Sequence, residues 1–131
     1  MKIWKAFVSA LFLLIVASCE KDSVDVNTTP CTMEFRTVSV TVIGDSLTQT
    51  HTVREKTGDT LEVVSMPYPE PERGISYTVL DDNFLSELKN SEELFRFVGL
   101  IHDSVVVDEW YRISADHCHI ELEEGNTVVV L

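Results

Sequence analysis

Hydrophobic and polar residues alternate along most of the chain after residue 31, and this pattern predicts a protein built from short β-strands. Val38, Val40 and Val42 are separated by Ser39 and Thr41, which is the period-two signature of a strand with one buried face. Further strands are predicted over residues 47–54, 60–66, 75–81, 94–101, 104–113, 116–122 and 127–131. Turn-forming residues rich in glycine, aspartate and asparagine separate most of these segments.

Two strand segments leave the choice of buried face open. Met33 and Phe35 have the opposite parity to the valines that follow, so we expect a bulge near Arg36-Thr37 to bring both sets to the core. In the next segment the threonines lie on one face and the larger side chains on the other. The threonines are Thr48, Thr50 and Thr52, and the larger side chains are Leu47, His51 and Val53.

Residues 83–89 form the only expected helical turn. Phe84, Leu85 and Leu88 would share one side of it, and Asp81 or Asp82 could cap its first turn. The preceding residues 67–74 contain three prolines, which lack the N–H donor that a central strand needs. We therefore expect that segment to be an exposed loop.

Seven or eight short strands predict an all-β fold, an antiparallel two-sheet β-sandwich with at most one short helical turn. A half-open barrel is the alternative. The strand at Ile75 to Asp81, the hairpin at Gly58-Asp59 and the closing hairpin at Gly125-Asn126 resemble prealbumin-like or carboxypeptidase-regulatory-like sandwiches of bacterial surface proteins. This resemblance implies a fold and does not by itself assign a function.

The N-terminal residues have the pattern of a secretory signal. Lys2 and Lys5 are positive, and the uncharged run from Ala6 to Ser18 is shorter than the about 20 apolar residues that span a bilayer. Val16-Ala17-Ser18-Cys19 resembles the lipobox of bacterial lipoproteins, in which an aliphatic residue and two small residues precede a cysteine. The resemblance implies cleavage before Cys19 and attachment of lipid to its thiol. An ordinary secretory signal is the alternative.

The residues after Cys19 suggest where in the cell envelope the protein is located. Glu20-Lys21-Asp22 resembles the short charged signals of Bacteroidota lipoproteins, which implies display on the outer face of the outer membrane; a charged tether is the alternative. The polar residues up to Pro30 lack an apolar period. The expected organisation is a signal peptide at 1–18, a flexible tether with lipidated Cys19 at 19–30, and a β-sandwich domain at 31–131.

The strong negative charge of the chain makes some classes of binding partner unfavourable. The chain has 22 acidic and 10 basic residues and a formal charge of −12, and loss of Lys2 and Lys5 with the signal would leave −14. Such a surface repels nucleic acid and anionic lipid headgroups. We expect no nucleic-acid partner, no cofactor, and contact with the membrane through the lipid anchor.

Cys31 and Cys118 are expected to form a disulfide bond. Lipidation of Cys19 would leave these two cysteines in an exported, oxidising compartment. The bond would join the start of the first strand to the penultimate strand and close a loop of about 88 residues, for which the chain-entropy model allows about 4–5 kcal/mol. Two free thiols or a metal site are the alternatives.

Asp116-His117-Cys118-His119 is the densest cluster of chemically versatile side chains. On a strand, His117 and His119 would share one face, and such a pair can bind Zn²⁺ or Cu²⁺. A third ligand could come from His102, Asp103 or Asp116. The alternative is that Cys118 points inward to a disulfide while both histidines are solvated or paired with carboxylates. A catalytic Cys118–histidine pair is disfavoured because neighbours on one strand point apart.

Gly44-Asp45-Ser46-Leu47 resembles the nucleophile block of the Gly-Asp-Ser-Leu family of lipases and esterases. The resemblance covers four residues only. That family has an α/β fold and several further blocks, including a C-terminal Asp-x-x-His, which this short, β-rich chain does not supply. We therefore interpret Ser46 as a turn residue.

Several exposed side chains are candidates for ligand binding. Asp81-Asp82, or Glu121, Glu123 and Glu124, could bind Ca²⁺, although neither run has the spacing of a known calcium loop. Tyr68, Trp110 and Tyr111 are candidates for a glycan-stacking platform, with burial in the core or on a sheet face as the alternative for Trp110 and Tyr111. Tyr68 is the preferred contact because loops carry function more often than strands do.

These features predict a lipid-anchored envelope or cell-surface protein that acts as a binding or accessory module without catalytic activity. Its partner would be an envelope protein or a glycan, with Tyr68 and Trp110 as candidate contacts. The alternatives are a metal-binding envelope protein that uses His117 and His119, and a small hydrolase that uses Ser46 or Cys118.

Overall fold

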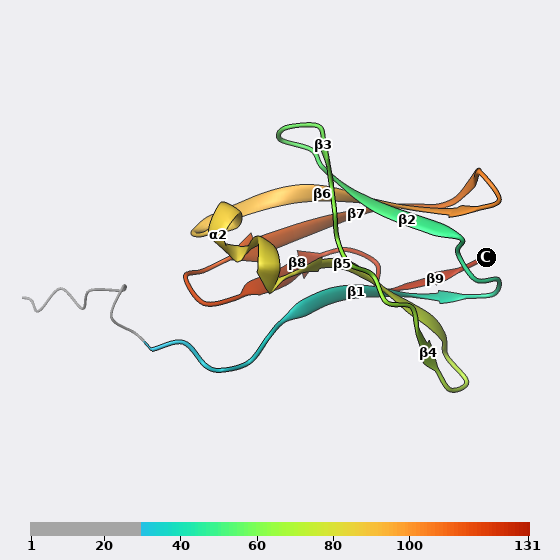
Figure 1. The fold of residues 1–131 in the computed structure, drawn as a ribbon, viewed down its shortest axis with the longest axis horizontal. Helices are drawn as coiled ribbons and strands as arrows, with labels where there is room; N and C mark the ends of the chain where they lie inside the picture. Colours follow the sequence, from blue (N-terminus) through green and yellow to red (C-terminus); the bar gives the residue numbers. More distant parts are fainter. Residues whose placement is uncertain (1–29) are drawn as a thin grey trace, which may run out of the picture. The chain divides into compact units, whose positions relative to one another are not determined.

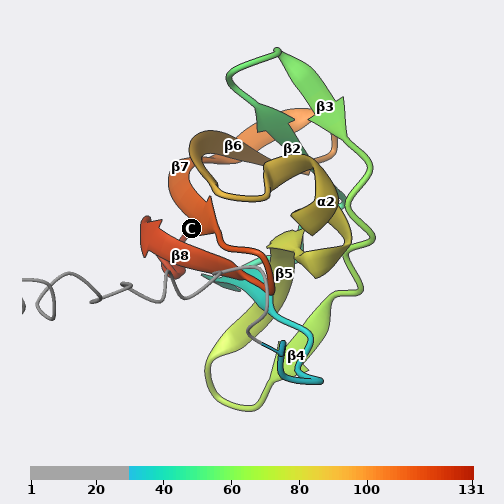
Figure 2. The same ribbon diagram turned by 90° about the vertical axis from the view of Figure 1, so that its left-hand side faces the viewer.

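Two packed β-sheets dominate residues 30–131, the part of the chain that the computed structural model describes (Figures 1 and 2). The elements in chain order are β1 (Thr37–Ile43), β2 (Gln49–Arg54), β3 (Asp59–Leu61), β4 (Tyr68–Glu70), β5 (Gly74–Asp81), the 3-10 turn η2 (Asp82–Phe84), α2 (Leu85–Leu88), β6 (Ser91–Ile101), β7 (Ser104–Ala115), β8 (Ile120–Glu124) and β9 (Val128–Val130). The sheet orders are β4-β5-β1-β9 and β3-β2-β6-β7-β8. The predicted all-β, two-sheet sandwich is confirmed.

All strand pairs in the two sheets are antiparallel except one, the pair of β1 with β9. β1 pairs with β5 in the antiparallel sense and with β9 in the parallel sense. The parallel pair joins the first and last strands of the domain, so the C-terminal strand completes the sheet that the first strand begins. The pairing extends over Thr41–Ile43 of β1 and is closed by a hydrogen bond from the Leu131 N–H to the Ile43 carbonyl, 3.0 Å.

The core lies between the two sheets and follows the alternation seen in the sequence. Inward-facing side chains from both sheets are almost fully buried: Val40, Val42, Tyr77, Val79, Leu80, Phe95, Phe97, Val107, Tyr111, Ile113 and Ile120. Burial of apolar surface on this scale is the main stabilising contribution in a small domain. In the segment 47–54, whose buried face was left open, Leu47 and Thr52 are the buried residues, and the Thr52 hydroxyl donates to the Val79 carbonyl at 2.7 Å.

The residues before β1 form an N-terminal arm, residues 31–36, outside both sheets. Met33 and Phe35 are exposed, so the expectation that a bulge would bring them to the core is wrong. A register shift does occur, but between Val38 and Ser39, inside the pairing of β1 with β5. It lies too far along the chain to turn the arm residues inward.

The segment between β3 and β4 differs from the prediction of a strand over 60–66. β3 ends at Leu61, and Val64 and Met66 are exposed. The physical reason is topological, because β3 belongs to one sheet and β4 to the other. A chain that crosses between sheets cannot stay in one ladder. The expected loop after it contains the short strand β4, an edge position where Pro69 is tolerated.

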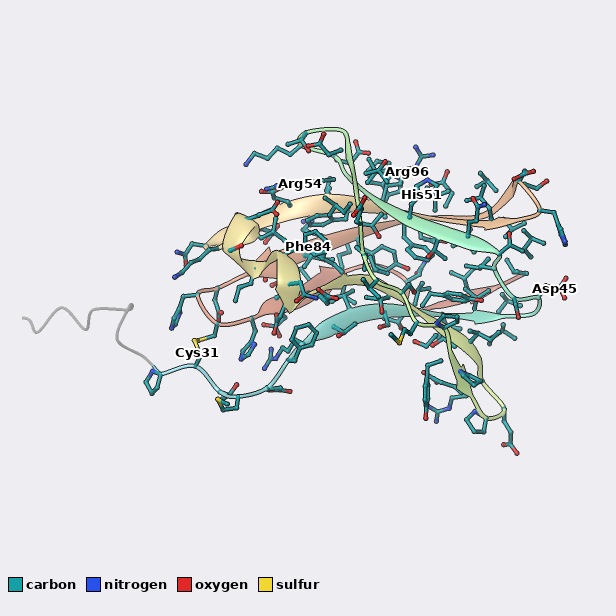
Figure 3. All side chains as sticks on the ribbon, in the orientation of Figure 1. Cys31, Asp45, His51, Arg54, Phe84 and Arg96 are labelled. Carbon is teal, nitrogen blue, oxygen red and sulfur yellow. A yellow bond between two sulfur atoms is a disulfide. The ribbon has the colours of Figure 1, made fainter. Side chains whose placement is uncertain are left out.

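The helical turn lies where it was predicted. The Asp81 carboxylate accepts a hydrogen bond from the Asn83 N–H at 2.9 Å and so caps η2, which leads into α2. Leu88 is buried. Cys31 lies at the end of the domain that carries α2, and the Asp45 turn lies at the opposite end (Figure 3).

Candidate functional site

A disulfide bond joins Cys31 to Cys118, as predicted, with 5.2 Å between the two Cα atoms. The elements that it joins differ from the expectation. Cys31 belongs to the N-terminal arm rather than to the first strand, and Cys118 belongs to the turn between β7 and β8 rather than to a strand. The bond therefore attaches the arm to the turn that follows β7, at the end of the β6–β7 hairpin opposite its His102-Asp103 turn.

Asp116 shapes the turn that contains Cys118. Its Oδ1 accepts hydrogen bonds from the N–H groups of Cys118 at 2.6 Å and His119 at 2.8 Å. These bonds outweigh partial burial and lower the pKa of the Asp116 carboxyl below its usual value. Aspartate commonly binds the backbone two and three residues ahead in this way. The predicted strand over 116–122 is consequently wrong at residues 116–119 and right at residues 120–122, since β8 begins at Ile120.

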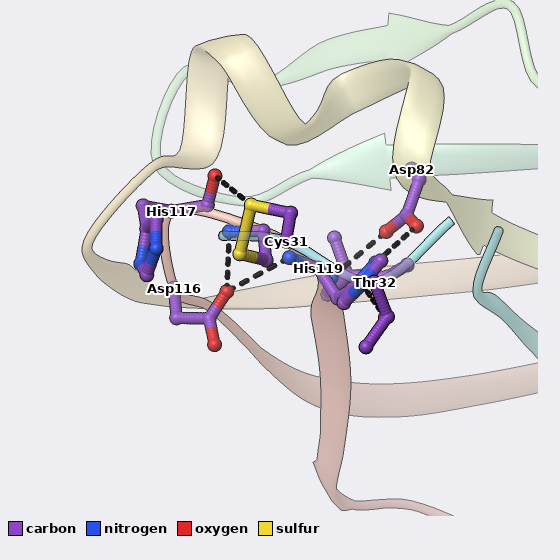
Figure 4. The surroundings of a disulfide bond; sticks show 8 residues. Cys31, Thr32, Asp82, Asp116, His117 and His119 are labelled. Atoms are coloured by element: carbon purple, nitrogen blue, oxygen red, sulfur yellow. Dashed lines mark hydrogen bonds and ion pairs between the residues drawn. A yellow bond between two sulfur atoms is a disulfide. The ribbon is translucent and has the colours of Figure 1, made fainter. Parts of the chain in front are cut away.

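His119 points away from the turn toward the arm and η2 (Figure 4). Its Nδ1 lies 2.9 Å from Asp82 Oδ2, and its Nε2 lies 2.8 Å from Thr32 Oγ1. The imidazole and the Asp82 carboxylate are only 10% and 8% exposed, so the pair is largely shielded from water. These three side chains come from three separate parts of the chain.

Asp82 connects these parts through its backbone contacts. Its Oδ2 also accepts the Arg36 N–H at 2.8 Å, its Oδ1 accepts the Ile120 N–H at 2.9 Å, and its own N–H donates to the Arg36 carbonyl at 3.0 Å. Burial opposes ionisation of this carboxyl, but the hydrogen bonds from Arg36, His119 and Ile120 prevail and lower its pKa. We call Thr32, Arg36, Asp82, His119 and Ile120 the Asp82 clasp.

The order of hydroxyl, imidazole and carboxylate in the clasp is that of the proton relay of serine hydrolases. The carboxylate is, however, shared with two backbone N–H groups. The N–H groups of Cys118 and His119, which could otherwise stabilise an oxyanion, both donate to Asp116. We interpret the clasp as the device that holds the arm against β8.

His117 and His119 do not lie on one face of a strand, which the predicted two-histidine metal site requires. Figure 4 shows the imidazoles of His117 and His119 on opposite sides of the disulfide. Among residues 30–131, the group of three potential ligands that lies close together is Cys31, His117 and Cys118, with ligand atoms within 4.8 Å. The two sulfur atoms are bonded to each other, so neither is a thiolate that could bind a metal ion. In the oxidised protein, the one potential metal ligand of this group is the His117 imidazole.

Two of the three proposed third ligands, His102 and Asp103, lie elsewhere. His102 and Asp103 form the tight turn between β6 and β7, whereas Asp116 follows the far end of β7. The 12 residues of β7 separate the two positions. A metal site that combines His102 or Asp103 with His117 and His119 is therefore not assembled.

The carboxylates considered for Ca²⁺ already have protein partners at their key positions. Asp81 caps η2, and Asp82 is the centre of the clasp. Glu123 accepts a hydrogen bond from the Ser114 hydroxyl, and Glu124 pairs with Arg112 at 3.1 Å. Glu121 is exposed and lines a groove on the outer face of the first sheet.

The aromatic candidates and Ser46 fall into different environments. Tyr111 is fully buried, so it belongs to the core. Trp110 is 46% exposed on β7 of the second sheet, and Tyr68 is 68% exposed on β4 of the first sheet. The fold does not bring Tyr68 and Trp110 into one site. Ser46 lies in the exposed turn between β1 and β2.

Sequence reasoning missed the Asp82–His119 pair, whose members are 37 residues apart. A comparison with known proteins found no matching family model, curated protein or solved structure. Within residues 30–131, no helix is both long enough and apolar enough to cross a membrane.

Proposed function

We propose that this chain is a lipid-anchored protein of the outer membrane, displayed at the cell surface, that works as a binding or accessory module without catalysis. The anchor proposal is supported by the lipobox-like residues Val16 to Cys19. These residues, the signal peptide at 1–18 and the tether up to residue 29 lie outside the described part of the chain. Two acyl chains or more on Cys19 would hold the protein stably, because one chain binds only weakly.

The observation that carries the proposal is the double attachment of the N-terminal arm. The proposed tether enters the domain at Cys31, which is covalently bound to Cys118. The Asp82 clasp then holds Thr32 and Arg36. A force on the tether would therefore be borne by the disulfide before it reached β1. Such an arrangement suits a domain that is held at one end.

The same attachment leaves the outer faces of both sheets for contacts. A groove of about 900 Å³ runs over the outer face of β1 and is bordered by Phe35 of the arm, Arg73 and Glu121. A second depression of about 540 Å³ lies beside Trp110. Both depressions are open to solvent, so they are surfaces for contact rather than enclosed cavities. These surfaces favour binding as the role of the domain.

The anchor is tested by metabolic labelling with an alkyne-tagged fatty acid in a bacterium that processes lipoproteins. We expect the wild-type chain to incorporate the label and to sediment with the outer membrane. The Cys19→Ala variant should lose the label. Protease added to intact cells should remove the wild-type domain if it faces outward. A mature chain that is cleaved and exported but unlabelled would support the ordinary secretory signal instead.

A further inference from the structure

Trp110 presents a fixed aromatic surface on the outer face of the second sheet. Its cross-strand neighbour on β6 is Arg96, whose guanidinium carbon lies 5.8 Å from the indole centroid. Arg96 is itself held by two hydrogen bonds to Asp108, at 2.7 and 2.6 Å. The ring is thus oriented by its neighbours before any ligand arrives, which lowers the entropy cost of binding.

Polar side chains of both kinds surround the depression beside the indole. Arg112 pairs with Glu124 at 3.1 Å. This pair, Asn126 and Glu109 place guanidinium, amide and carboxylate groups around the depression. A guanidinium has five N–H donors and a carboxylate about four acceptor sites, so these pairings leave further sites for a ligand. Leu94 adds an apolar wall. The Asn126 side-chain N–H donates to Glu109 at 3.0 Å, which fixes the amide and leaves its carbonyl oxygen and second N–H for a ligand.

The rim of the depression is rigid because the turn after β8 packs directly on the core. Gly125 has a φ of +148°, and a Cβ at this position would lie 2.4 Å from Tyr111 Cδ1 and 3.0 Å from the Trp110 carbonyl oxygen. The buried Tyr111 hydroxyl donates to the Asn126 carbonyl at 2.6 Å. Only glycine allows this close approach, and the approach holds Asn126 next to the indole.

From this arrangement we infer that the depression beside Trp110 binds one or two rings of a neutral saccharide. The inference rests on the proposed binding function and names the ligand class. Arg96 lies over one face of the indole, and the other face can attract the weakly positive C–H face of a sugar ring. Planar carboxylate, amide and guanidinium groups at its edge can bind neighbouring hydroxyls in pairs. The chain's formal charge of −12 disfavours an anionic saccharide.

Tyr68, the other candidate contact, lacks these features. It is an exposed residue on a three-residue edge strand, and it does not line either of the two depressions described above. Tyr68→Ala therefore serves as the matched control, since it removes an exposed aromatic ring of comparable accessibility from the opposite sheet.

Trp110 offers a direct optical readout. The chain has two tryptophans, Trp4 and Trp110, so Trp110 alone reports after loss of the signal, and a Trp4→Phe background removes the other if the signal is retained. The full-length chain, exported and purified in mild detergent, is titrated with cello-, xylo-, manno- and malto-oligosaccharides. We expect a saturable fluorescence change with at least one of them and none with oligogalacturonate, an anionic comparison.

Calorimetry with the saccharide that binds then tests the site. Trp110→Ala should weaken binding at least about tenfold, and Trp110→Phe should weaken it less because an aromatic face remains. Asn126→Ala should also weaken binding, whereas Tyr68→Ala should not. Circular dichroism confirms that each variant is folded. The inference is overturned if no neutral saccharide binds the folded chain, or if Trp110→Ala binds as tightly as the wild type.

This test is independent of the anchor. A chain that carries lipid at Cys19 but binds no neutral saccharide would overturn the saccharide inference alone. A chain that binds the saccharide but incorporates no fatty acid would overturn the anchoring proposal alone.

Discussion

Glu93 is one of the charged residues that are buried in the domain. Its carboxylate is almost fully buried on β6, and it accepts two hydrogen bonds from the Arg54 guanidinium at 2.6 and 2.9 Å and one from Lys56 at 3.3 Å. The bonds from Arg54 lower the pKa of Glu93 even though burial acts in the opposite direction. A buried carboxylate is tolerated only with such partners.

We predict that Glu93→Gln lowers the free energy of unfolding by about 1–3 kcal/mol at pH 7, because the amide cannot replace the charged, two-point contact with Arg54. Urea denaturation followed by circular dichroism measures this loss. Glu92→Gln is the matched control. Glu92 is exposed and lies 3.8 Å from Arg112, so its replacement should change stability by less than about 0.5 kcal/mol.

The pH dependence of the same pair provides a second prediction. Because the folded-state pKa of Glu93 is below its unfolded value of about 4.3, the carboxylate stabilises the fold above that pH, and the contribution is lost as pH falls through the folded pKa. The wild type should therefore lose stability below about pH 4 and approach the Glu93→Gln variant. A stability difference that stayed constant down to pH 3 would show that the Glu93 charge is not its source.

At the scale of elements, the N-terminal arm is ordered without belonging to a sheet. A segment outside a ladder needs other partners for its backbone. The arm obtains them from Asp82, which binds both the N–H and the carbonyl of Arg36. The arm is therefore positioned by the Asp82 carboxylate, by the hydrogen bond between Thr32 and His119, and by one disulfide bond, and its order should respond to loss of the carboxylate and of the disulfide separately.

We predict that Asp82→Ala releases the arm while the sandwich stays folded. The amides of Arg36 and Ile120 both donate to this carboxylate, so their hydrogen exchange should accelerate by at least about tenfold, which corresponds to the loss of about 1.4 kcal/mol of protection. Exchange followed by NMR measures both amides. Asp81→Asn is the control, because asparagine can still cap η2 and does not contact the arm. Unchanged exchange at Arg36 in Asp82→Ala would refute the role given to the clasp.

At the scale of the whole molecule, one covalent bond spans nearly the entire domain. Cys31 and Cys118 are 87 residues apart in sequence. Crosslinking so long a segment restricts the unfolded chain strongly, and the expected stabilisation is largest for long loops. The bond also lies outside both sheets, so its removal leaves no cavity between them.

We predict that the Cys31→Ser, Cys118→Ser double variant folds but loses about 2–4 kcal/mol of stability relative to the oxidised wild type. Urea midpoints with and without reductant measure the loss. Reductant should lower the wild-type midpoint and leave that of the double variant unchanged. If reductant had no effect on the wild type, the disulfide would not contribute to the stability of the folded protein.

Much of the architecture could be predicted because its signals are local. Alternation over Val38 to Val42 identifies a strand, the aspartates before Asn83 identify a helical cap, and two cysteines in a domain that is expected to be exported indicate a disulfide. The same reasoning failed where the conformation of a segment depends on contacts that the local pattern does not show. Residues 62–66 include Val63, Val64 and Met66, which favour a strand, but this segment crosses from one sheet to the other. Residues 116–119 were expected to begin a strand, but the Asp116 carboxylate accepts hydrogen bonds from the N–H groups of Cys118 and His119 and so holds these residues in a turn.

The sequence by itself predicted the class of fold, from the period of residues close together in the chain, and the pairing of Cys31 with Cys118, from the two cysteines that remain once Cys19 is set aside. The proposed location also rests on the sequence alone. Only the tertiary structure decided that β1 and β9 run side by side, that His119 meets Asp82, and that Trp110 is flanked by Arg96 and the Asn126 turn. Periodicity specifies which side of a strand is buried. Which strands become neighbours depends on how two whole sheets pack, and the candidate binding surface depends on those neighbours.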